Sequence, residues 1–414
     1  MKIAVIGLGF VGLTVALGFA DKGFDVAGYD IDEGRRASIR GGIVPFFEPG
    51  LGMALKDNLN VKFAISENAW GAAKNADVVF LCVGTPCEDD GKADLQYLFA
   101  AINSITGALS HECVFIIKST VPPGTTANMV SPYLRGKAFN GAVVVNPEFL
   151  REGYCWKDFT APDRIVCGCG ERDIKAKELL AELYAPFNAP IHFVSQNTAE
   201  FIKYLSNSLL ASLISFSNEM AFIAEAAGSV NVAKAFKILH QDKRLSDAGI
   251  KHYIYPGCGY GGYCLPKDTA ALSMNSKQLG FTPRILDGVI SLNNEMPLQT
   301  ARKIERLAGS RVAKIGILGL SFKPNSDDVR DSSAAKIIDC LVRDGYINIF
   351  AYDPAAMKTF SEMYGFAINY CGTKEAVCDI CDTIAVITIW PEFQGVNQKY
   401  PQKKWCDCRY WLED

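Results

Sequence analysis

One segment of the sequence combines the residue types that covalent catalysis requires. Residues 261–268 read GGYCLPKD. Proline suits the first turn of a helix, so Pro266 predicts that Cys264 lies just before a helix N-terminus, where unpaired N–H groups and the helix dipole favour a thiolate. Lys267 adds positive charge, Asp268 supplies a carboxylate positioned to act on water, and the two glycines would let a substrate approach the backbone closely. We therefore predict that Cys264 is a nucleophile rather than an inert buried thiol.

A lysine and an asparagine form a second candidate group. Lys203 and Asn207 are four residues apart in an apolar stretch, so a helix would present both on one face. A desolvated lysine has a lowered pKa and an amide can hold an oxyanion, and alcohol oxidation needs both functions. The structural alternative is a lysine whose stem reaches solvent beside an ordinary amide. These two residues alone leave both interpretations open.

A glycine motif near the N-terminus predicts a dinucleotide site. Gly7, Gly9 and Gly12 follow a short apolar run and open a helical pattern, and Asp30 ends the next apolar run. In this fingerprint the first glycine makes the turn, the second admits the pyrophosphate and the third lets the helix pack on the strand. An acid at position 30 accepts the ribose hydroxyls and favours NAD over NADP, although the motif alone also allows FAD.

The elements that position these groups follow an α/β plan. Apolar runs at 2–6, 24–30, 77–83, 113–118 and 142–145 alternate with helical segments, which is typical of a doubly wound parallel sheet. Residues 198–227 contain neither glycine nor proline and predict one long helix that ends at Gly228. After residue 311 the strand and helix pattern returns, with strands at 313–318, 347–352 and 383–389 and a helix at 333–344.

This pattern predicts three domains. They are an N-terminal Rossmann domain over 1–195 that binds the cofactor, a helical middle domain over 196–300 and a C-terminal Rossmann-like domain over 301–414. The length of 414 residues agrees with two or three cores. The long central helix would act as a spine between domains or as a dimer contact.

The composition excludes several classes of protein. A net charge of −3 without a basic stripe argues against a nucleic-acid partner. No apolar run reaches the roughly 18 residues of a membrane span, and the N-terminus lacks the plan of a signal peptide, so we expect a cytoplasmic protein without a membrane partner. The 14 cysteines are scattered, which favours buried thiols. We expect no metal site, because the closely spaced cysteine pairs lack convergent ligands and the four histidines lie elsewhere.

Seven motifs in order along the chain resemble those of the UDP-glucose/GDP-mannose dehydrogenase family. They are GLGFVG at 7–12, VGTP at 83–86, KSTVPPGT at 118–125, NPEFLREG at 146–153, Lys203 with Asn207, GYGGYCLPKD at 259–268 and FKPNSDDVRDS at 322–332. The resemblance covers nearly the whole chain. It implies two Rossmann-like domains joined by a long helix that builds a homodimer. It also implies that NAD oxidises the primary alcohol of a nucleotide sugar to a carboxylate.

The resemblance further implies a catalytic role for each matching residue. The residues concerned are Cys264, Lys203, Asn207, Asp268, Thr120 and Glu148. Thr120 and Glu148 would flank an ordered water, while Asp268 and Lys203 would handle protons in the first oxidation. The lysine and the asparagine would hold the developing oxyanion. Cys264 would attack the aldehyde and keep it as a thioester until water releases the acid, so that two NAD molecules are reduced per sugar.

The binding residues are carried over in the same way. Besides the three fingerprint glycines, the implied cofactor contacts are Val11, Asp30, Arg35, Thr85, Thr120, Glu152, Lys267 and Arg330. The implied substrate contacts are Glu148, Phe149, Leu150, Arg151, Glu152, Lys203, Asn207, Arg244, Tyr253, Ile254, Tyr255, Pro256, Gly257, Gly261 and Lys323. The family often has lysine in place of Arg35. Arg244 matches an arginine that reaches the neighbouring subunit in relatives, but the segment after it is longer than usual.

The substrate within the family is predicted from two aromatic residues. Tyr260 and Tyr263, in GYGGYCLPKD, resemble UDP-glucose oxidisers more than enzymes for GDP-mannose or for UDP-N-acetylhexosamines. A single-step hydroxyacid dehydrogenase of related fold would have no use for Cys264. A non-catalytic nucleotide-sugar sensor would not need Cys264, Lys203 and Asp268 together.

Overall fold

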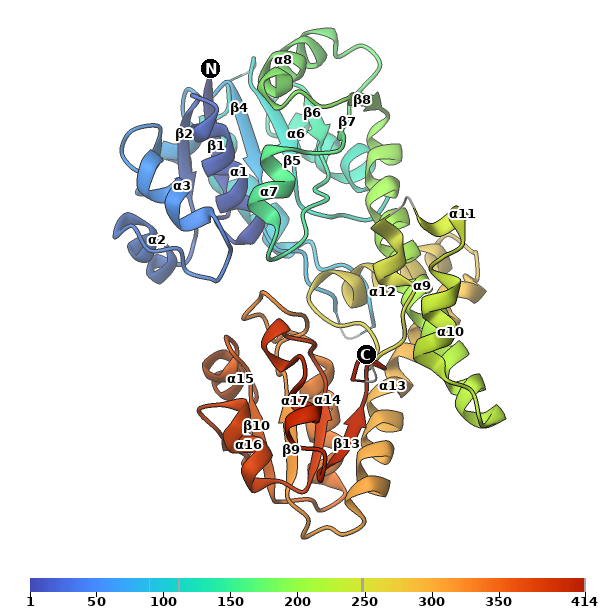
Figure 1. Ribbon diagram of the computed structural model, residues 1–414. Helices are drawn as coiled ribbons and strands as arrows, with labels where there is room; N and C mark the ends of the chain where they lie inside the picture. Colours follow the sequence, from blue (N-terminus) through green and yellow to red (C-terminus); the bar gives the residue numbers. More distant parts are fainter. Residues whose placement is uncertain (89, 111, 247–248, 413–414) are drawn as a thin grey trace. The chain divides into compact units, whose positions relative to one another are not determined.

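The chain forms two α/β units with largely parallel sheets (Figure 1). The computed structural model describes residues 1–88, 90–110, 112–246 and 249–412. The two compact units are Met1–Leu205 and Ser206–Asp414. The predicted α/β class, with two Rossmann-like sheets and a long central helix, is confirmed. The division into three domains stays a prediction.

The sheet of the first unit has eight strands in the order β3-β2-β1-β4-β5-β6-β7-β8. Neighbouring strands are parallel, except that β6 and β7 are antiparallel. The strands are β1 (Lys2–Ile6), β2 (Asp25–Tyr29), β3 (Phe63–Ile65), β4 (Val78–Leu81), β5 (Val114–Ile117), β6 (Val143–Val145), β7 (Ile165–Gly168) and β8 (Ile191–Val194). The five strands that the apolar runs predict are all present, with shorter ends. The sequence pattern does not predict β3, β7 or β8, which are strands of three or four residues.

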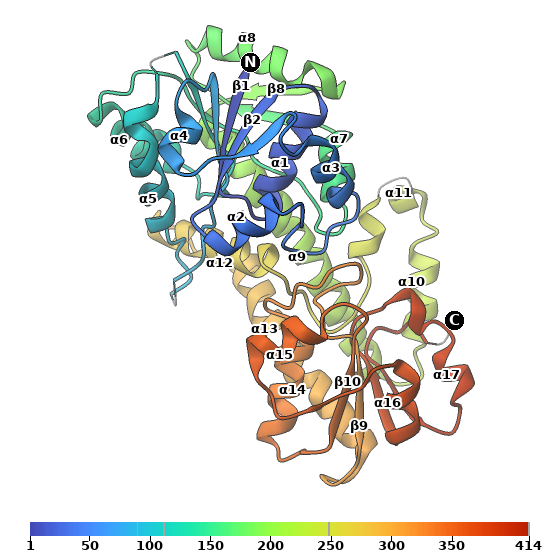
Figure 2. The same ribbon diagram turned by 90° about the vertical axis from the view of Figure 1, so that its left-hand side faces the viewer.

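Helices cover both faces of this sheet. They are α1 (Phe10–Asp21), α2 (Glu33–Arg40), α3 (Leu51–Asn58), α4 (Ala69–Ala73), α5 (Gln96–Ile105), α6 (Ser131–Gly136), α7 (Cys155–Thr160) and α8 (Ile174–Tyr184). Figure 2 shows α4, α5 and α6 on one side of the strands and α1, α3 and α7 on the other. The alternation within β1 explains both layers. Ile3 and Val5 pack into the core under α1, while Ala4 and Ile6 pack into the core under α4 and α5.

A helix of 32 residues, α9 (Gln196–Ala227), begins directly after β8. It starts two residues before the predicted helix because the Ser195 hydroxyl accepts a hydrogen bond from the Thr198 N–H at 3.2 Å, which caps the first turn. It ends at Gly228, whose φ of +72° lies in the left-handed region that ends helices. The stop signal at Gly228 is therefore confirmed.

The sheet of the second unit has five parallel strands in the order β11-β10-β9-β12-β13. The strands are β9 (Ile315–Leu318), β10 (Ile349–Tyr352), β11 (Asn369–Tyr370), β12 (Thr383–Val386) and β13 (Lys404–Asp407). The helices are α10 (Val232–Leu239), α11 (Lys243–Ser246), α12 (Cys264–Gln278), α13 (Arg284–Ala308), α14 (Ser333–Arg343), α15 (Met357–Tyr364), α16 (Lys374–Ile380) and α17 (Val396–Lys399). Buried apolar side chains lie on both faces of this sheet as well.

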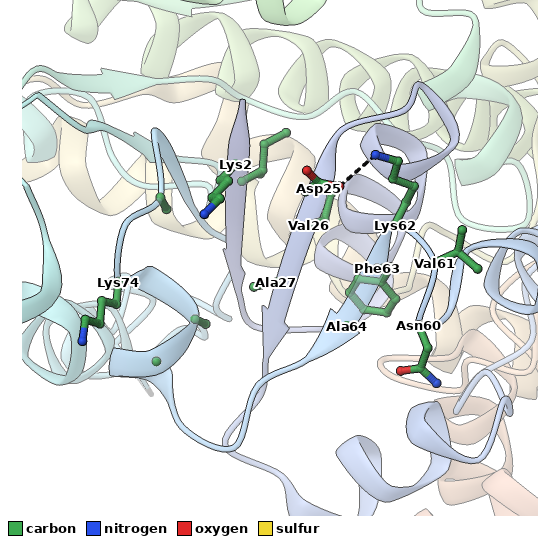
Figure 3. A pocket seen from close by; sticks show the side chains of 14 residues that line it. Lys2, Asp25, Val26, Ala27, Asn60, Val61, Lys62, Phe63, Ala64 and Lys74 are labelled. Atoms are coloured by element: carbon green, nitrogen blue, oxygen red, sulfur yellow. Dashed lines mark hydrogen bonds and ion pairs between the residues drawn. The ribbon is translucent and has the colours of Figure 1, made fainter.

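A hollow of about 390 Å³ lies at the amino ends of β1, β2 and β3 (Figure 3). Lys62 and Asp25 both line this hollow, and their side chains form an ion pair at 2.9 Å. Ligands of doubly wound sheets bind at the carboxyl ends of the strands, which is the opposite end. The candidate active site is therefore not this hollow but the loops after β1, β4, β5 and β6.

Candidate active site

The glycine turn after β1 has the geometry that a dinucleotide fingerprint requires. Gly7 has a φ of +91°, and a Cβ on it would lie 2.6 Å from the Cys82 carbonyl oxygen. A Cβ on Gly12 would lie 1.8 Å from the Gly7 carbonyl oxygen, so α1 packs closely on the turn. A Cβ on Gly9 would meet nothing within 4 Å, which leaves open space beside the backbone at the N-terminus of α1. The turn therefore fits an approaching pyrophosphate.

The acid that ends β2 is held in place by this turn. Asp30 is 3% exposed, and one carboxylate oxygen accepts hydrogen bonds from the Leu8 N–H at 2.7 Å and from Arg35 at 3.0 Å. The other oxygen accepts the Asp32 N–H at 2.9 Å. The structure thus brings together Asp30 and Arg35, two predicted cofactor residues. A buried carboxylate at this position disfavours a second phosphate on the ribose.

The loops after β4 and β5 also meet. The Thr85 hydroxyl donates a hydrogen bond to the Thr120 carbonyl at 2.7 Å, and the Ser119 hydroxyl donates to the Val83 carbonyl at 2.7 Å. These contacts join the VGTP and KSTVPPGT motifs at the carboxyl end of the sheet. Val11 and Glu152, the other predicted cofactor contacts of this unit, are half-buried.

Lys203 on α9 forms a buried ion pair with Glu148 in the loop after β6. The two side chains are 5% and 7% exposed, and Nζ lies 2.7 Å from Oε1. The other carboxylate oxygen accepts the Leu150 N–H at 2.6 Å. Burial by itself would raise the pKa of Glu148, but the attraction of Lys203, its hydrogen bond and the Leu150 N–H lower the pKa below the usual range. Glu148 is therefore a carboxylate, and Lys203 is buried as predicted but paired.

The loop between β6 and α7 carries several predicted substrate residues. Arg151 is exposed, and its guanidinium binds both carboxylate oxygens of Asp158, at 2.6 and 2.9 Å. The guanidinium of Arg164 lies 4.2 Å from the centre of the Phe149 ring. Leu150 is half-buried. The sequence analysis identifies neither Asp158 as the partner of Arg151 nor Arg164 as the partner of Phe149. Their spacing along the chain does not distinguish them from other charged residues.

Glu48 is a buried carboxylate that holds the same loop and that the sequence analysis does not identify. Its oxygens accept the Gly153 N–H at 2.7 Å and the Cys155 N–H at 2.8 Å. Burial raises the pKa of Glu48, and these N–H groups only partly offset that effect. Because Glu48 precedes its partners by more than 100 residues, only the fold reveals the contact.

In the second unit, Cys264 is the first residue of α12 and is exposed. The helix thus begins one residue earlier than Pro266 predicts, and the thiol lies in the first turn rather than before it. The Asp268 carboxylate is 1% exposed, and it binds Lys267 at 2.5 Å through one oxygen and the Asn207 amide at 2.5 Å through the other. Attraction by Asp268 outweighs burial and raises the pKa of Lys267. The structure brings Cys264, Lys267, Asp268 and Asn207 into one group.

The two glycines before Cys264 have a different role from the predicted one. A Cβ on Gly261 would lie 2.3 Å from the Asp331 carbonyl oxygen, and a Cβ on Gly262 would lie 2.7 Å from the Phe322 ring. Gly262 also has a φ of +80°. These glycines therefore make room for the 322–331 segment of the same unit, a packing role that the sequence analysis does not identify. Their role in the approach of a substrate stays a prediction.

That segment carries two further predicted residues. Arg330 binds the Asp328 carboxylate through two hydrogen bonds and lies 4.5 Å from the centre of the Tyr263 ring. Lys267 lies 5.5 Å from the same ring, so Tyr263 contacts two cations. Lys323 lies 5.2 Å from the ring of its neighbour Phe322.

The predicted substrate stretch 253–257 is anchored on its own unit. Tyr253 ends a short 3-10 helix, Ile254 and Pro256 are buried, and the Tyr255 hydroxyl donates to the Tyr410 carbonyl at 2.6 Å. The Gly257 N–H donates to Asn218 at 2.7 Å, and a Cβ on Gly257 would lie 2.4 Å from the Arg409 guanidinium. Arg409 is thus a cation beside this stretch that the sequence analysis misses.

Arg244 and the cysteines complete the predicted set. The Arg244 side chain is 88% exposed and pairs with Asp242, so the structure does not bring it into either group.

All 14 cysteines are thiols, and Cys264 is the one that is exposed. Within the described ranges, no group of three or more histidine, cysteine or acidic side chains is placed to hold a metal ion.

These features define a class of enzyme. A glycine turn with open space, followed by a buried acid at the end of β2, is the dinucleotide site of an oxidoreductase. An exposed thiol in the first turn of a helix, beside a lysine, lies in an environment that favours a thiolate.

Comparison with known proteins gives the family. Three domain models of the UDP-glucose/GDP-mannose dehydrogenase family match: the NAD binding domain over 1–188, the central domain over 197–295 and the UDP binding domain over 316–414. The chain belongs to this family, and it is an NAD-dependent oxidoreductase.

Individual relatives cover nearly the whole chain. The UDP-glucose 6-dehydrogenase of Rhizobium meliloti is 37% identical over 96% of this chain and 91% of its own length. The structure of a UDP-glucose dehydrogenase from Pyrobaculum islandicum has a TM-score of 0.93 and 36% identity, and covers 99% of this chain and 94% of its own. A UDP-D-ManNAc dehydrogenase from Pyrococcus horikoshii has a TM-score of 0.85 and 30% identity, with 98% and 93% covered.

A pair of alanine substitutions tests the two glycine roles. Gly9→Ala adds a methyl group where the protein has open space, so we expect an unchanged melting temperature but at least tenfold weaker NAD binding, because the methyl would meet the pyrophosphate. Gly12→Ala forces α1 away from the turn, so we expect the first thermal transition to fall by several degrees. Calorimetry of unfolding and of NAD binding measures both. Parental NAD affinity in Gly9→Ala would contradict the cofactor assignment.

Proposed function

We propose that this chain oxidises UDP-glucose at C6 to UDP-glucuronate, in two successive oxidations and through a covalent intermediate on Cys264. The observation that carries the proposal is the exposed thiol at the start of α12, grouped with Lys267, Asp268 and Asn207. A dehydrogenase that stops at an aldehyde or ketone has no need of this nucleophile. The relatives named UDP-glucose 6-dehydrogenase support the substrate.

In the first oxidation the C6 hydroxyl loses its proton while C6 loses a hydride. NAD, when bound at the glycine turn, accepts one hydride in each oxidation. Lys203 takes the hydroxyl proton, and the Glu148 carboxylate holds the lysine in position. Thr120 and Glu148 position the water that is used later, and the Asn207 amide with Lys203 stabilises negative charge on the substrate oxygen.

In the second oxidation the Cys264 sulfur adds to the aldehyde carbon, and a proton goes to its oxygen. The resulting thiohemiacetal has a hydride to lose, whereas the bare aldehyde does not give one readily. Loss of that hydride and of the oxygen proton leaves a thioester. Water then adds to the thioester carbon, and the C–S bond breaks to give the carboxylate and the thiol. Asp268, held by Lys267 and Asn207, handles the proton of this water.

The nucleotide sugar contacts residues of both groups in this proposal. The proposed contacts are Glu148, Phe149, Leu150, Arg151, Glu152, Lys203, Asn207, Tyr253, Ile254, Tyr255, Pro256, Gly257, Gly261 and Lys323. Arg244 would contact the nucleotide sugar that is bound to a neighbouring subunit. Tyr260 and Tyr263 beside the nucleophile favour the unsubstituted hexose. The similarity to a UDP-D-ManNAc dehydrogenase makes UDP-N-acetylmannosamine the second candidate substrate.

The stoichiometry of NADH tests the function directly. Incubation with NAD and a panel of UDP-glucose, UDP-N-acetylhexosamines and GDP-mannose should give two NADH per UDP-glucose, with no aldehyde in the medium. The physical reason is that only a covalent bond to Cys264 keeps the intermediate bound between the two oxidations. NADH absorbance and an aldehyde trap measure both quantities. One NADH per sugar, or free aldehyde, would contradict the covalent mechanism, and turnover of another sugar alone would reassign the substrate.

Two substitutions should affect different steps. Lys203→Ala removes the base of the first oxidation, so we expect its single-turnover rate to fall by about 10² to 10⁴. Asp268→Asn hinders thioester hydrolysis, so we expect an acyl-enzyme on Cys264 that appears as added mass in the intact protein. Cys264→Ala in the Asp268→Asn background is the control and should show no such mass, because alanine has no nucleophilic atom. Added mass that persists in this control would place the adduct on another residue.

We also propose a cytoplasmic homodimer that pairs through α9, with no nucleic acid or membrane partner. Five large apolar side chains of α9 are between 46% and 55% exposed: Phe201, Leu205, Leu209, Phe216 and Ile223. Their spacings of four and seven residues place them in one stripe along the helix. An exposed apolar stripe of this kind is typical of a protein interface.

By length and composition alone α9 could also cross a membrane. Its polar residues argue against that alternative. Glu200 is buried and accepts the Gly124 N–H at 2.6 Å and the Thr126 N–H at 2.8 Å, and Lys203 is paired with Glu148. Long apolar helices are common in the cores of water-soluble proteins, and here the helix is an integral part of two compact units.

A charged residue in the stripe should dissociate the dimer. We expect sedimentation of the parent at twice the chain mass and of Phe216→Glu at the chain mass, because the glutamate would be buried without a partner. Ile347→Glu, at a position that is 72% exposed but outside α9, is the matched control and should remain dimeric. A dimeric Phe216→Glu, or a monomeric parent, would contradict the proposal.

A further inference from the structure

A second buried lysine lies at the carboxyl end of the first sheet, and the mechanism above does not use it. Lys118 directly follows β5 and is 6% exposed. Its ammonium donates a hydrogen bond at 2.8 Å to the side-chain oxygen of Asn146, which directly follows β6. The same oxygen accepts the Tyr184 hydroxyl at 2.5 Å, and the Asn146 amide donates to the Val166 carbonyl at 2.8 Å. The Asn146 side chain is therefore held by Tyr184 and Val166, and it in turn holds the ammonium group of Lys118.

The charged and titratable groups around Lys118 come from each element packed on it. Cys82 follows β4, Cys167 lies in β7, Glu148 lies in the loop after β6 and Lys203 lies on α9. Tyr184 of α8 reaches the site through Asn146. Burial lowers the pKa of Lys118 to about 8, while Cys82 and Glu148 oppose that effect. Burial raises the pKa of both Cys82 and Cys167 to about 12, so these thiols are neutral.

Glu148 is the carboxylate among these groups. It pairs with Lys203 at 2.7 Å, and it lies two residues after Asn146, whose side chain binds Lys118 at 2.8 Å. We propose that Lys118 is a positioning residue for the first oxidation, a second buried cation that acts through Glu148 on Lys203. This inference rests on the proposed function, in which Lys203 accepts the proton of the alcohol. Lys118 need not touch the substrate in this role.

The argument is one of charge compensation. Lys203 can accept a proton only after it has lost its own, and that loss removes the cation with which the buried Glu148 carboxylate is paired. A buried carboxylate without a cation is strongly unfavourable. Because the pKa of Lys118 is about 8, Lys118 keeps its proton at neutral pH. Lys118 and the Glu148 carboxylate then remain a neutral pair when Lys203 is neutral, so Lys203 gives up its proton more easily. Without Lys118, Lys203 would retain its proton to a higher pH.

The titration of Lys203 tests this without sugar or NAD. Protein labelled with carbon-13 at the lysine Cε is titrated by NMR, and the Lys203 signal is assigned as the one missing from Lys203→Arg. We expect the midpoint of Lys203 to lie about one pH unit higher in Lys118→Met than in the parent. Because no substrate is present, a chain that fails to oxidise UDP-glucose would refute the proposed function and leave this measurement valid.

Two further variants separate charge from packing. Tyr184→Phe removes a neutral hydrogen bond to the same Asn146 oxygen and should leave the Lys203 midpoint unchanged, even if it lowers the melting temperature. Asn146→Asp places a carboxylate against Lys118 and should raise the midpoint as Lys118→Met does, which keeps the test available if Lys118→Met does not fold. If the parent oxidises UDP-glucose, the acid limb of its kcat profile should move with the same variants.

An unchanged Lys203 midpoint in both charge variants would overturn the proposal and leave Lys118 as a structural link between β5 and β6. An equal shift in Tyr184→Phe would also overturn it, because the effect would then come from the hydrogen-bond network rather than from the charge.

Discussion

The polar face of α9 is the constraint on which the candidate site depends. Glu200, Lys203 and Asn207 follow one another at spacings of three and four residues, and all three are buried. Buried polar groups must be paired, and each of these meets a different segment. Glu200 binds the amides after β5, Lys203 binds Glu148 after β6, and Asn207 binds Asp268 on α12. In the first unit α9 thereby holds two loops that carry candidate site residues, and in the second unit it holds α12.

Burial separates the reactive thiol from the inert ones. The pKa values of Cys82, Cys113, Cys167, Cys378 and Cys381 are raised to about 12 by burial, which keeps these side chains protonated. Cys264 is exposed in the first turn of α12, where helix N–H groups and Lys267 attract a thiolate. Cys258 is an exception among the buried thiols, because its hydrogen bond with Cys408 lowers its pKa to about 7. Cys264 is the exposed thiol, and its use as the nucleophile is the proposal made above.

Cations and carboxylates around the candidate site are held in pairs. Arg35 binds Asp30, Arg151 binds Asp158, Lys203 binds Glu148, Lys267 binds Asp268 and Arg330 binds Asp328. All five of these cations are predicted ligand contacts. Pairing fixes their long side chains before a ligand binds, which reduces the entropy lost on binding. A phosphate group of a ligand would meet cations that are already oriented. Each cation would then bind both the phosphate and its carboxylate partner.

The sequence by itself determined the features that local patterns encode. The eight strands predicted above, the long helix to Gly228, the glycine turn with Asp30 and the cysteine at a helix start follow from periodicity, turn residues and spacing along the chain. The short strands β3, β7, β8, β11 and β13 do not. Tertiary structure alone decided the partners. Four such contacts join residues that are distant in sequence. Glu148 pairs with Lys203, and Glu48 binds the loop before α7. Arg409 lies beside Gly257, and Gly261 packs against the 322–331 segment. No spacing rule links such residues, because their contacts arise only when buried charge and close-packed backbone must be satisfied in three dimensions.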